Sequence, residues 1–134
     1  MRDVRQPQPI ARAFPAHPSA LFGVRKFLRD RAAADGFGPR LTDEIVLAAS
    51  EASANAVLHS GSPIFRVSWQ VDSGRVVIEV ADDGHFQRRV PLGLPGSAGH
   101  GITLIMALID EVTIRQGSSG QPGTVVRMTK YLDG

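Results

Sequence analysis

The sequence contains no cysteine, which excludes a disulfide framework, a thiolate metal site and a cysteine nucleophile. Its four histidines are scattered and show no metal-ligand spacing such as H-E-x-x-H. No stretch approaches the roughly 20 consecutive apolar residues of a membrane-spanning helix, and the N-terminal residues lack the apolar segment of a signal peptide. We therefore expect a cytoplasmic protein, without a membrane partner, whose chemistry uses carboxylates, amides, hydroxyls and the backbone.

The chain also has little charge of one sign. Its 15 Lys and Arg residues face 13 Asp and Glu residues, which leaves a net charge of +2 and gives no basic tail. We therefore expect no direct binding to nucleic acid. A chain of 134 residues with 43% hydrophobic residues suits one ordinary domain. We expect a flexible tail over residues 1–9 and a single domain over residues 10–134.

Hydrophobic periodicity divides the chain into strands and helices. The expected elements are, in order, a strand over 10–14, a helix that begins at Pro18 and is closed by Gly36, a helix capped by Thr42 that ends near His59, a hairpin of 64–71 with 75–81, a loop over 82–99, a short apolar helix over 102–109, and a hairpin of 112–116 with 124–131. Because the strands are grouped and do not alternate with helices, we expect an α+β fold. It has a mainly antiparallel, mixed sheet with helices on one face.

The second helix carries a polar stripe. Glu51, Asn55 and His59 recur every fourth residue, and residues four apart lie on one face of a helix. A carboxylate one turn from an amide suits magnesium, which takes oxygen ligands and keeps several waters. The alternative is a solvated helix face with unrelated polar residues.

Two acids and a glycine, Asp82, Asp83 and Gly84, follow the strand that ends near residue 81. One carboxylate at this strand end would accept a hydrogen bond from a ligand amino group, and Gly84 would keep the backbone clear. An ordinary turn is the alternative.

Glycines also precede the short apolar helix. Gly99 and Gly101 would let an anion approach unpaired backbone N–H groups. The segment from Gly96 to Gly101 has the spacing of a P-loop, but Ile102, followed by Thr103, stands where the P-loop lysine belongs. A P-loop is thus rejected, as is a dinucleotide-binding G-x-G-x-x-G site, because the glycines are too few.

Taken in order, these segments resemble the Bergerat fold, the ATP-binding module of gyrases, heat-shock chaperones, histidine kinases and mismatch-repair proteins. The four boxes of that module correspond to 51–59, 82–84, 99–101 and 123–124. The chain is more similar still to stand-alone bacterial anti-sigma factors with serine-kinase activity. They share S-E-x-x-x-N-A-x-x-H, L-I-D-E-V and G-T-x-V-R-M-T-K, so the resemblance extends from about Ile10 to Leu132.

The resemblance assigns roles on the phosphate side of an ATP site. Asn55 is similar to the ligand of the Mg²⁺ ion that bridges to the phosphates. Glu51 matches the general base that polarises the acceptor serine hydroxyl. Gly99 and Gly101 would wrap the phosphates as part of a lid. His59 is expected to be a hydrogen-bond partner at the helix end.

The resemblance also assigns the adenine side. Asp82, beside Gly84, matches the carboxylate that reads the adenine amino group, and Thr124 would support adenine through hydroxyl or water contacts. The usual D-x-G-x-G box departs here, because Phe86 replaces the second glycine. Whether Asp82 or Asp83 faces adenine is left open by the sequence.

The resemblance implies an ATP-dependent serine-protein kinase that is also an anti-sigma factor. Its partners would be a sigma factor and an anti-anti-sigma factor with a STAS domain, and it would form a homodimer. The alternative is a nucleotide-gated module of the same fold that binds a protein without phosphorylating it. A detached histidine-kinase ATPase domain is a weaker alternative, because no long dimerisation helix with a phosphoacceptor histidine precedes the domain.

Overall fold

A computed structural model gives the fold and describes residues 8–59, 61–83, 104–116 and 123–132. In chain order, its strands and long helices are β1 (Ile10–Pro15), α1 (Ala20–Ala34), α2 (Pro39–His59), β2 (Ile64–Asp72), β3 (Arg75–Asp82), β4 (Glu111–Gln116) and β5 (Thr124–Tyr131). Residues 104–108 form one further short helix. The expected hairpin over 64–81 and the two strands of the C-terminal hairpin are confirmed.

The strands form one five-stranded sheet in the order β1-β2-β3-β5-β4. All four pairings are antiparallel, so the sheet has no mixed part among the described strands. A two-residue turn joins β2 to β3, and both of its residues, Ser73 and Gly74, have positive φ angles. This geometry matches the twist of a tight hairpin and explains the S-G pair between two alternating segments.

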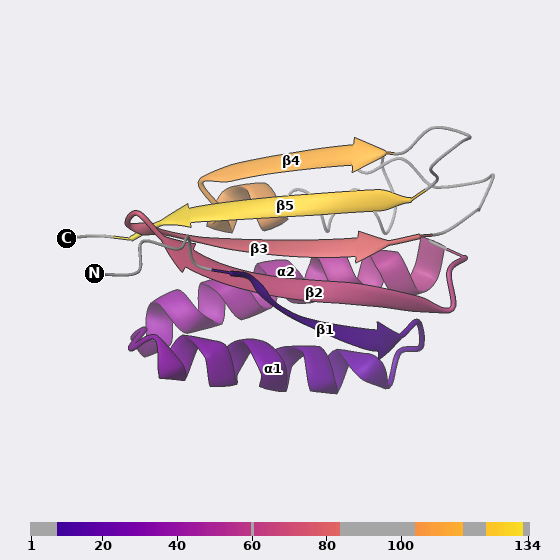
Figure 1. Cartoon of the computed structure of the whole chain (residues 1–134), viewed down its shortest axis with the longest axis horizontal. Coiled ribbons are helices and arrows are strands. Elements are labelled where there is room, and N and C mark those ends of the chain that lie inside the picture. The colour runs from indigo at the N-terminus through magenta and orange to yellow at the C-terminus, as the bar shows by residue number, and fades with distance from the viewer. Residues whose placement is uncertain (1–7, 60, 84–103, 117–122, 133–134) are drawn as a thin grey trace, which may run out of the picture.

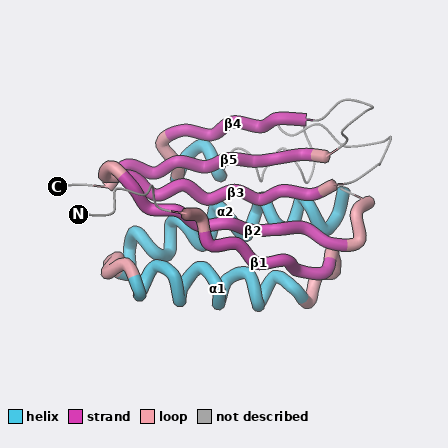
Figure 2. The backbone as a smooth tube through the Cα atoms, viewed as in Figure 1, coloured by secondary structure: helices cyan, strands magenta, loops and turns pink. Residues whose placement is uncertain are grey.

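Both long helices cover the same face of the sheet, α1 next to β1 and α2 behind β2 and β3 (Figures 1 and 2). The α+β fold with helices on one face is thus confirmed. Along the central strands, alternate side chains point to the helices and form the core, among them Phe65, Val67 and Trp69 of β2 and Val76, Ile78 and Val80 of β3. Phe14 of β1 stacks on Phe65 with ring centroids 5.7 Å apart.

Both expected helix starts were wrong, the first by two residues and the second, whose cap was expected at Thr42, by four. α1 begins at Ala20, two residues after Pro18, because 16–19 form a turn in which the Ala20 N–H donates to the His17 carbonyl. α2 begins at Pro39, and Thr42 lies inside its first turn, where its hydroxyl donates to the Gly38 carbonyl at 2.8 Å. Proline suits the first helical position because its missing N–H would have no partner there.

The expected apolar helix over 102–109 is described from residue 104. Its core side chains are Ile105 and Ile109, and the Ile109 N–H donates to the Ile105 carbonyl. The expected tail over 1–9 lies outside the described residues except for residues 8 and 9, and the expected loop over 82–99 does so from residue 84 onward. No helix in the described part of the chain is long and apolar enough to span a membrane.

Candidate functional site

Glu51 and Asn55 lie on the side of α2 that faces β5. Ion pairs on the helix fix this direction: Glu44 pairs with Lys130 of β5 at 3.2 Å, whereas the neighbouring Asp43 pairs with Arg29 of α1 at 2.9 Å. Glu51 follows Glu44 by seven residues, two helical turns, and therefore continues the stripe that faces β5. Glu51 and Asn55, two of the three residues of the predicted stripe, thus face into the molecule, toward the side of the sheet that carries β5 and β4.

Asn55 has a polar atom without a partner. The side-chain nitrogen of Asn55 is buried and makes no hydrogen bond to any described residue. A buried amide group without a partner costs about 1–3 kcal/mol, so a ligand that satisfies it gains that energy. Rotation of the amide by 180° exchanges its nitrogen and oxygen, so either atom can face the ligand. An oxygen there is a ligand type that Mg²⁺ accepts, and Asn55 therefore fits the expected metal role.

Asp82 ends β3 and is buried, with only 7% of its surface exposed. It follows Val76, Ile78 and Val80 in the strand alternation, so its side chain points toward the helix layer. Across the sheet, Asp82 lies opposite Thr124, the first residue of β5, which is 8% exposed. The two residues expected on the adenine side are therefore neighbours on adjacent strands.

Asp83 has a different environment. Its carboxylate accepts two hydrogen bonds from one guanidinium nitrogen of Arg66, at 3.0 and 3.1 Å, and the side chain is 61% exposed. Arg66 belongs to the residues of β2 that alternate away from the helices. The structure therefore separates the two acids: Asp82 is directed into the molecule, and Asp83 forms a surface ion pair.

Gly123 brings β5 close to the end of β3. A Cβ atom built on Gly123 would lie 2.5 Å from the Asp82 carbonyl oxygen, and its φ of 136° is a conformation that L side chains rarely adopt. Only glycine fits this position without displacing the backbone of Asp82. The G-T pair of the sequence therefore has a steric reason beside its resemblance to a known box.

The fold brings these groups to one end of the molecule. The C-terminal end of α2, the end of β3 and the start of β5 all lie at the right-hand end of Figure 1. The remaining predicted site residues, Gly84, Gly99 and Gly101, lie outside the described residues. The same holds for Phe86 and for the side chain of His59. Among the described residues, no three His, Asp or Glu side chains gather as a metal cage.

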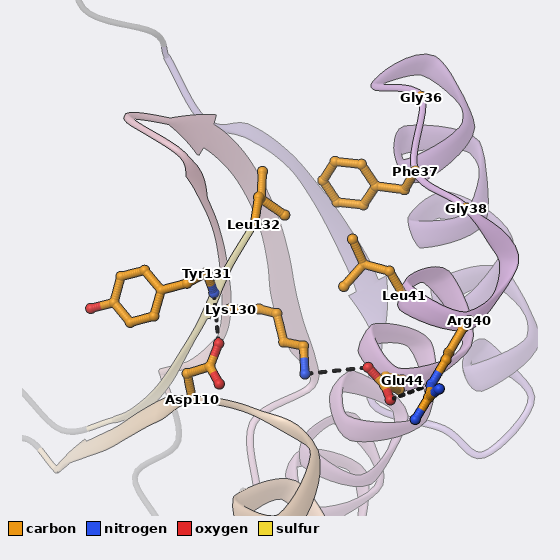
Figure 3. A pocket seen from close by; sticks show the side chains of 10 residues that line it. All are labelled: Gly36, Phe37, Gly38, Arg40, Leu41, Glu44, Asp110, Lys130, Tyr131 and Leu132. Carbon is orange, nitrogen blue, oxygen red and sulfur yellow. Dashed lines mark hydrogen bonds and ion pairs between the residues drawn. The ribbon is translucent and has the colours of Figure 1, made fainter. Parts of the chain in front are cut away.

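The opposite end of the molecule holds a cavity that the sequence did not indicate. It has a volume of about 840 Å³ and lies between the turn that joins α1 to α2 and the end of β5 (Figure 3). Its lining combines apolar groups, such as Phe37 and Leu132, with Glu44 and Lys130. At its edge Tyr131 donates a hydrogen bond to Glu111, and this bond raises the pKa of the tyrosine hydroxyl.

A family model fits this chain over residues 14–130, which is most of its length, and describes a histidine kinase-like ATPase domain. The chain belongs to this family, as the four boxes of the sequence implied. Its five-stranded antiparallel sheet with helices on one face is the fold of that family.

Individual relatives narrow the comparison. The chain is 31% identical to a protein of Bacillus velezensis named serine-protein kinase RsbW, over 93% of this chain and 86% of the relative. A solved structure of the RsbU and RsbW domains of a Mycobacterium tuberculosis protein is 27% identical with a TM-score of 0.73. The match covers 93% of the present chain but only 32% of the longer Mycobacterium chain. The histidine kinase AdeS of Acinetobacter baumannii shares the fold, with a TM-score of 0.53 over 98% of this chain and 70% of its own, at 14% identity.

Proposed function

We propose that this chain is an ATP-dependent serine-protein kinase that acts as an anti-sigma factor. It phosphorylates a serine of an anti-anti-sigma factor with a STAS domain, and it sequesters a sigma factor. The observation that carries the ATP site is the buried side-chain nitrogen of Asn55, which has no partner among the described residues and lies one helical turn from Glu51, in a member of an ATPase family. The name of the Bacillus relative supports the choice of serine as acceptor.

Each site residue has a task in this proposal. Asp82 accepts a hydrogen bond from the adenine amino group, Thr124 supports the same side, and Gly84 leaves room beside them. The choice of Asp82 over Asp83 is supported by the burial of Asp82 on the helix side of β3, whereas Asp83 is exposed in a surface ion pair with Arg66. A hydrogen bond to a carboxylate that is screened from water is electrostatically stronger than one to an exposed carboxylate.

On the phosphate side, Gly99 and Gly101 would offer backbone N–H groups to the phosphates, and Asn55 would hold Mg²⁺ by its amide oxygen. The ion, when bound, neutralises negative charge on the phosphates. Glu51 accepts the proton of the acceptor serine as the serine oxygen bonds to the γ-phosphorus. The bond from that phosphorus to the β,γ-bridging oxygen breaks, and ADP leaves with the electron pair.

Further parts of the proposal concern assembly and location. We propose that the chain forms a homodimer, as the resemblance to anti-sigma factors implies. We place the protein in the cytoplasm, where ATP and the proposed partners occur.

The test is phosphate transfer by the variant Glu51→Gln. The protein is incubated with magnesium, ATP labelled at the γ-phosphate and the STAS-domain proteins of its own organism. We expect the variant to transfer phosphate to serine about 100-fold or more slowly, because a positioned general base contributes roughly that factor. Its dissociation constant for ATP, from equilibrium dialysis, should stay within about threefold, since the change is nearly isosteric.

A matched control is Glu79→Gln, the same change on the opposite face of the sheet, where Glu79 pairs with Arg127. It should transfer phosphate like the unchanged protein. Equal transfer by Glu51→Gln would contradict the general-base role. Tight ATP binding by the unchanged chain without any labelled serine would replace the kinase with the nucleotide-gated binding module.

A further inference from the structure

The side of α2 that faces away from the sheet is poor in charge. From residue 45 to residue 58 the helix carries one charged side chain, Glu51, whereas Arg40, Asp43 and Glu44 crowd its first turns. A surface helix normally places charged and polar residues opposite its buried face, because that side meets water. Beyond its first turns, α2 therefore lacks the residues that usually solvate the outer side of a helix.

Two large apolar side chains are exposed on this side. Leu47 is 45% exposed and Leu58 is 63% exposed. Leu58 follows Leu47 by eleven residues, close to three full turns, so the two lie on one line along the helix, with Ala54 between them. The residues Ala49 and Ala56 lie on the opposite side and pack in the core. We call Leu47, Ala54 and Leu58 the outer strip.

Glu51 borders the outer strip. It follows Leu47 by four residues and precedes Leu58 by seven, and its side chain is partly buried. At about 1.5 Å of rise per residue, the two leucines lie about 6 and 10.5 Å from Glu51 along the helix axis. The proposed general base is therefore flanked on both sides by exposed apolar groups of its own helix.

A protein that brings a serine hydroxyl to Glu51 has to cover these groups. The hydroxyl oxygen must come within about 2.6–3.2 Å of the carboxylate for proton transfer. A stable protein interface covers about 800 Å² on each partner, which for a round patch is a radius of about 16 Å. A patch centred near Glu51 thus includes both leucines, and burial of their exposed surface favours the complex.

We propose that the outer strip of α2 is a docking surface for the phosphoacceptor protein and that Leu47 and Leu58 contribute to its recognition. The matching surface beside the acceptor serine is apolar, because a charged group placed there would lose its hydration without gaining a partner. The inference rests on the proposed function, since Glu51 acts on a protein serine only there. Neither leucine touches the nucleotide or the reacting atoms. Each therefore affects the KM for the acceptor protein and leaves kcat unchanged.

The test uses the STAS-domain protein of the same organism that the unchanged chain labels on serine. Its KM and kcat are measured at saturating magnesium-ATP for Leu47→Gln, Leu58→Gln and the double variant. Glutamine has nearly the helix propensity of leucine, so α2 is retained. We expect each single change to raise KM about fivefold, because the gain from burying the exposed part of one leucine is lost. The two positions are about 16.5 Å apart along the helix, so the losses multiply to about 25-fold in the double variant.

Matched controls separate recognition from structure. Leu47→Met and Leu58→Met keep the apolar surface and should leave KM within about twofold. Ile10→Thr changes an apolar side chain of similar exposure, 44%, on strand β1 and should also leave KM unchanged. The helix signal in circular dichroism and the dissociation constant for ATP should stay within experimental error and about twofold, respectively. If the double variant does not fold, each single variant is measured alone.

The outcomes distinguish the inference from the proposed function. An unchanged KM in the glutamine variants would overturn the inference. A fall in kcat at constant KM would also overturn it, because the leucines would then act on the chemical step. Altered self-association at constant KM would overturn it as well and would assign the outer strip to a second copy of the chain. If the unchanged protein labels no STAS-domain protein on serine, the proposed function fails instead.

Discussion

The two ends of α2 differ in how their polar groups are satisfied. At the C-terminal end, the buried nitrogen of Asn55 has no partner among the described residues. At the N-terminal end, Glu44 contacts both Lys130 and Arg40, and the nearby turn is tied to the sheet. Because buried polar groups are nearly always paired in folded proteins, the buried amide nitrogen of Asn55 supports the proposed ligand site at this end.

The N-terminal end of α2 and the turn before it are connected to the core by hydrogen bonds and ring packing. The indole N–H of Trp69, the single tryptophan, donates to the Asp35 carboxylate at 2.7 Å, and the Phe37 ring lies against the indole with centroids 5.4 Å apart. At the same end the Leu132 N–H donates to the Gly74 carbonyl at 2.8 Å. We therefore propose that this end acts as a scaffold and that the other end holds the binding site. Changes at the first should affect stability, and changes at the second should affect affinity.

The largest effect is expected from Asp82→Asn at the binding end. The change keeps the shape of the side chain but removes the charge that strengthens a hydrogen bond to the adenine amino group. Hydrogen bonds to charged groups contribute about 1.5–3 kcal/mol, which corresponds to roughly a 10- to 150-fold rise in the dissociation constant. Calorimetric titration with magnesium-ATP checks this. An affinity within twofold of the unchanged protein would remove Asp82 from the adenine site.

A smaller effect, and one on stability, is expected from Asp35→Ala at the scaffold end. The variant leaves the Trp69 indole N–H, in a side chain only 2% exposed, without its acceptor. We expect the free energy of unfolding to fall by about 1–3 kcal/mol, measured by denaturant titration. Tryptophan fluorescence follows the transition directly.

Asp35→Asn is the matched control, because the amide oxygen of asparagine can still accept the indole hydrogen bond. It should recover most of the lost stability. Both variants should bind ATP within about twofold of the unchanged protein when folded. A selective loss of ATP affinity in Asp35→Ala would break the division between a scaffold end and a binding end.

Local patterns in the sequence predicted the sheet well and the helix starts less well. The alternation over 64–81 identified the hairpin, because side chains on a strand face opposite sides in turn. The start of α2 was placed at Thr42, a preferred capping residue, although Pro39 occupies the first helical position. The preference for threonine as a capping residue and the preference for proline at the first helical position gave different starts. The hydrogen bond from the Thr42 hydroxyl to the Gly38 carbonyl, which places Thr42 inside the helix, cannot be read from the sequence pattern.

For the candidate site, too, local patterns predict some features and miss those that depend on tertiary contacts. Strand alternation from Val76 through Val80 already places Asp82 on the core side, so the sequence contained the signal that separates it from Asp83. The contacts of Lys130 with the Leu108 carbonyl and with Glu44 could not be predicted, because they join residues 22 and 86 positions away in the chain through tertiary packing. Periodicity rules predict which residues share a face of one helix or strand. They do not predict contacts of a lysine with residues of two other segments.

The smallest effect is expected from Asp83→Asn, which is also the sharpest control for Asp82. The Arg66–Asp83 pair is 44% and 61% exposed, and exposed ion pairs contribute about 0–1 kcal/mol. We expect a loss of stability within that range, measured by denaturant titration, that shrinks further at 1 M salt because the charges are screened. ATP affinity should remain within about twofold, since the Asp83 carboxylate points away from the helix layer. If Asp83→Asn weakened ATP binding as much as Asp82→Asn, the strand alternation at the end of β3 would not decide which acid reads adenine, and the two assignments would have to be exchanged.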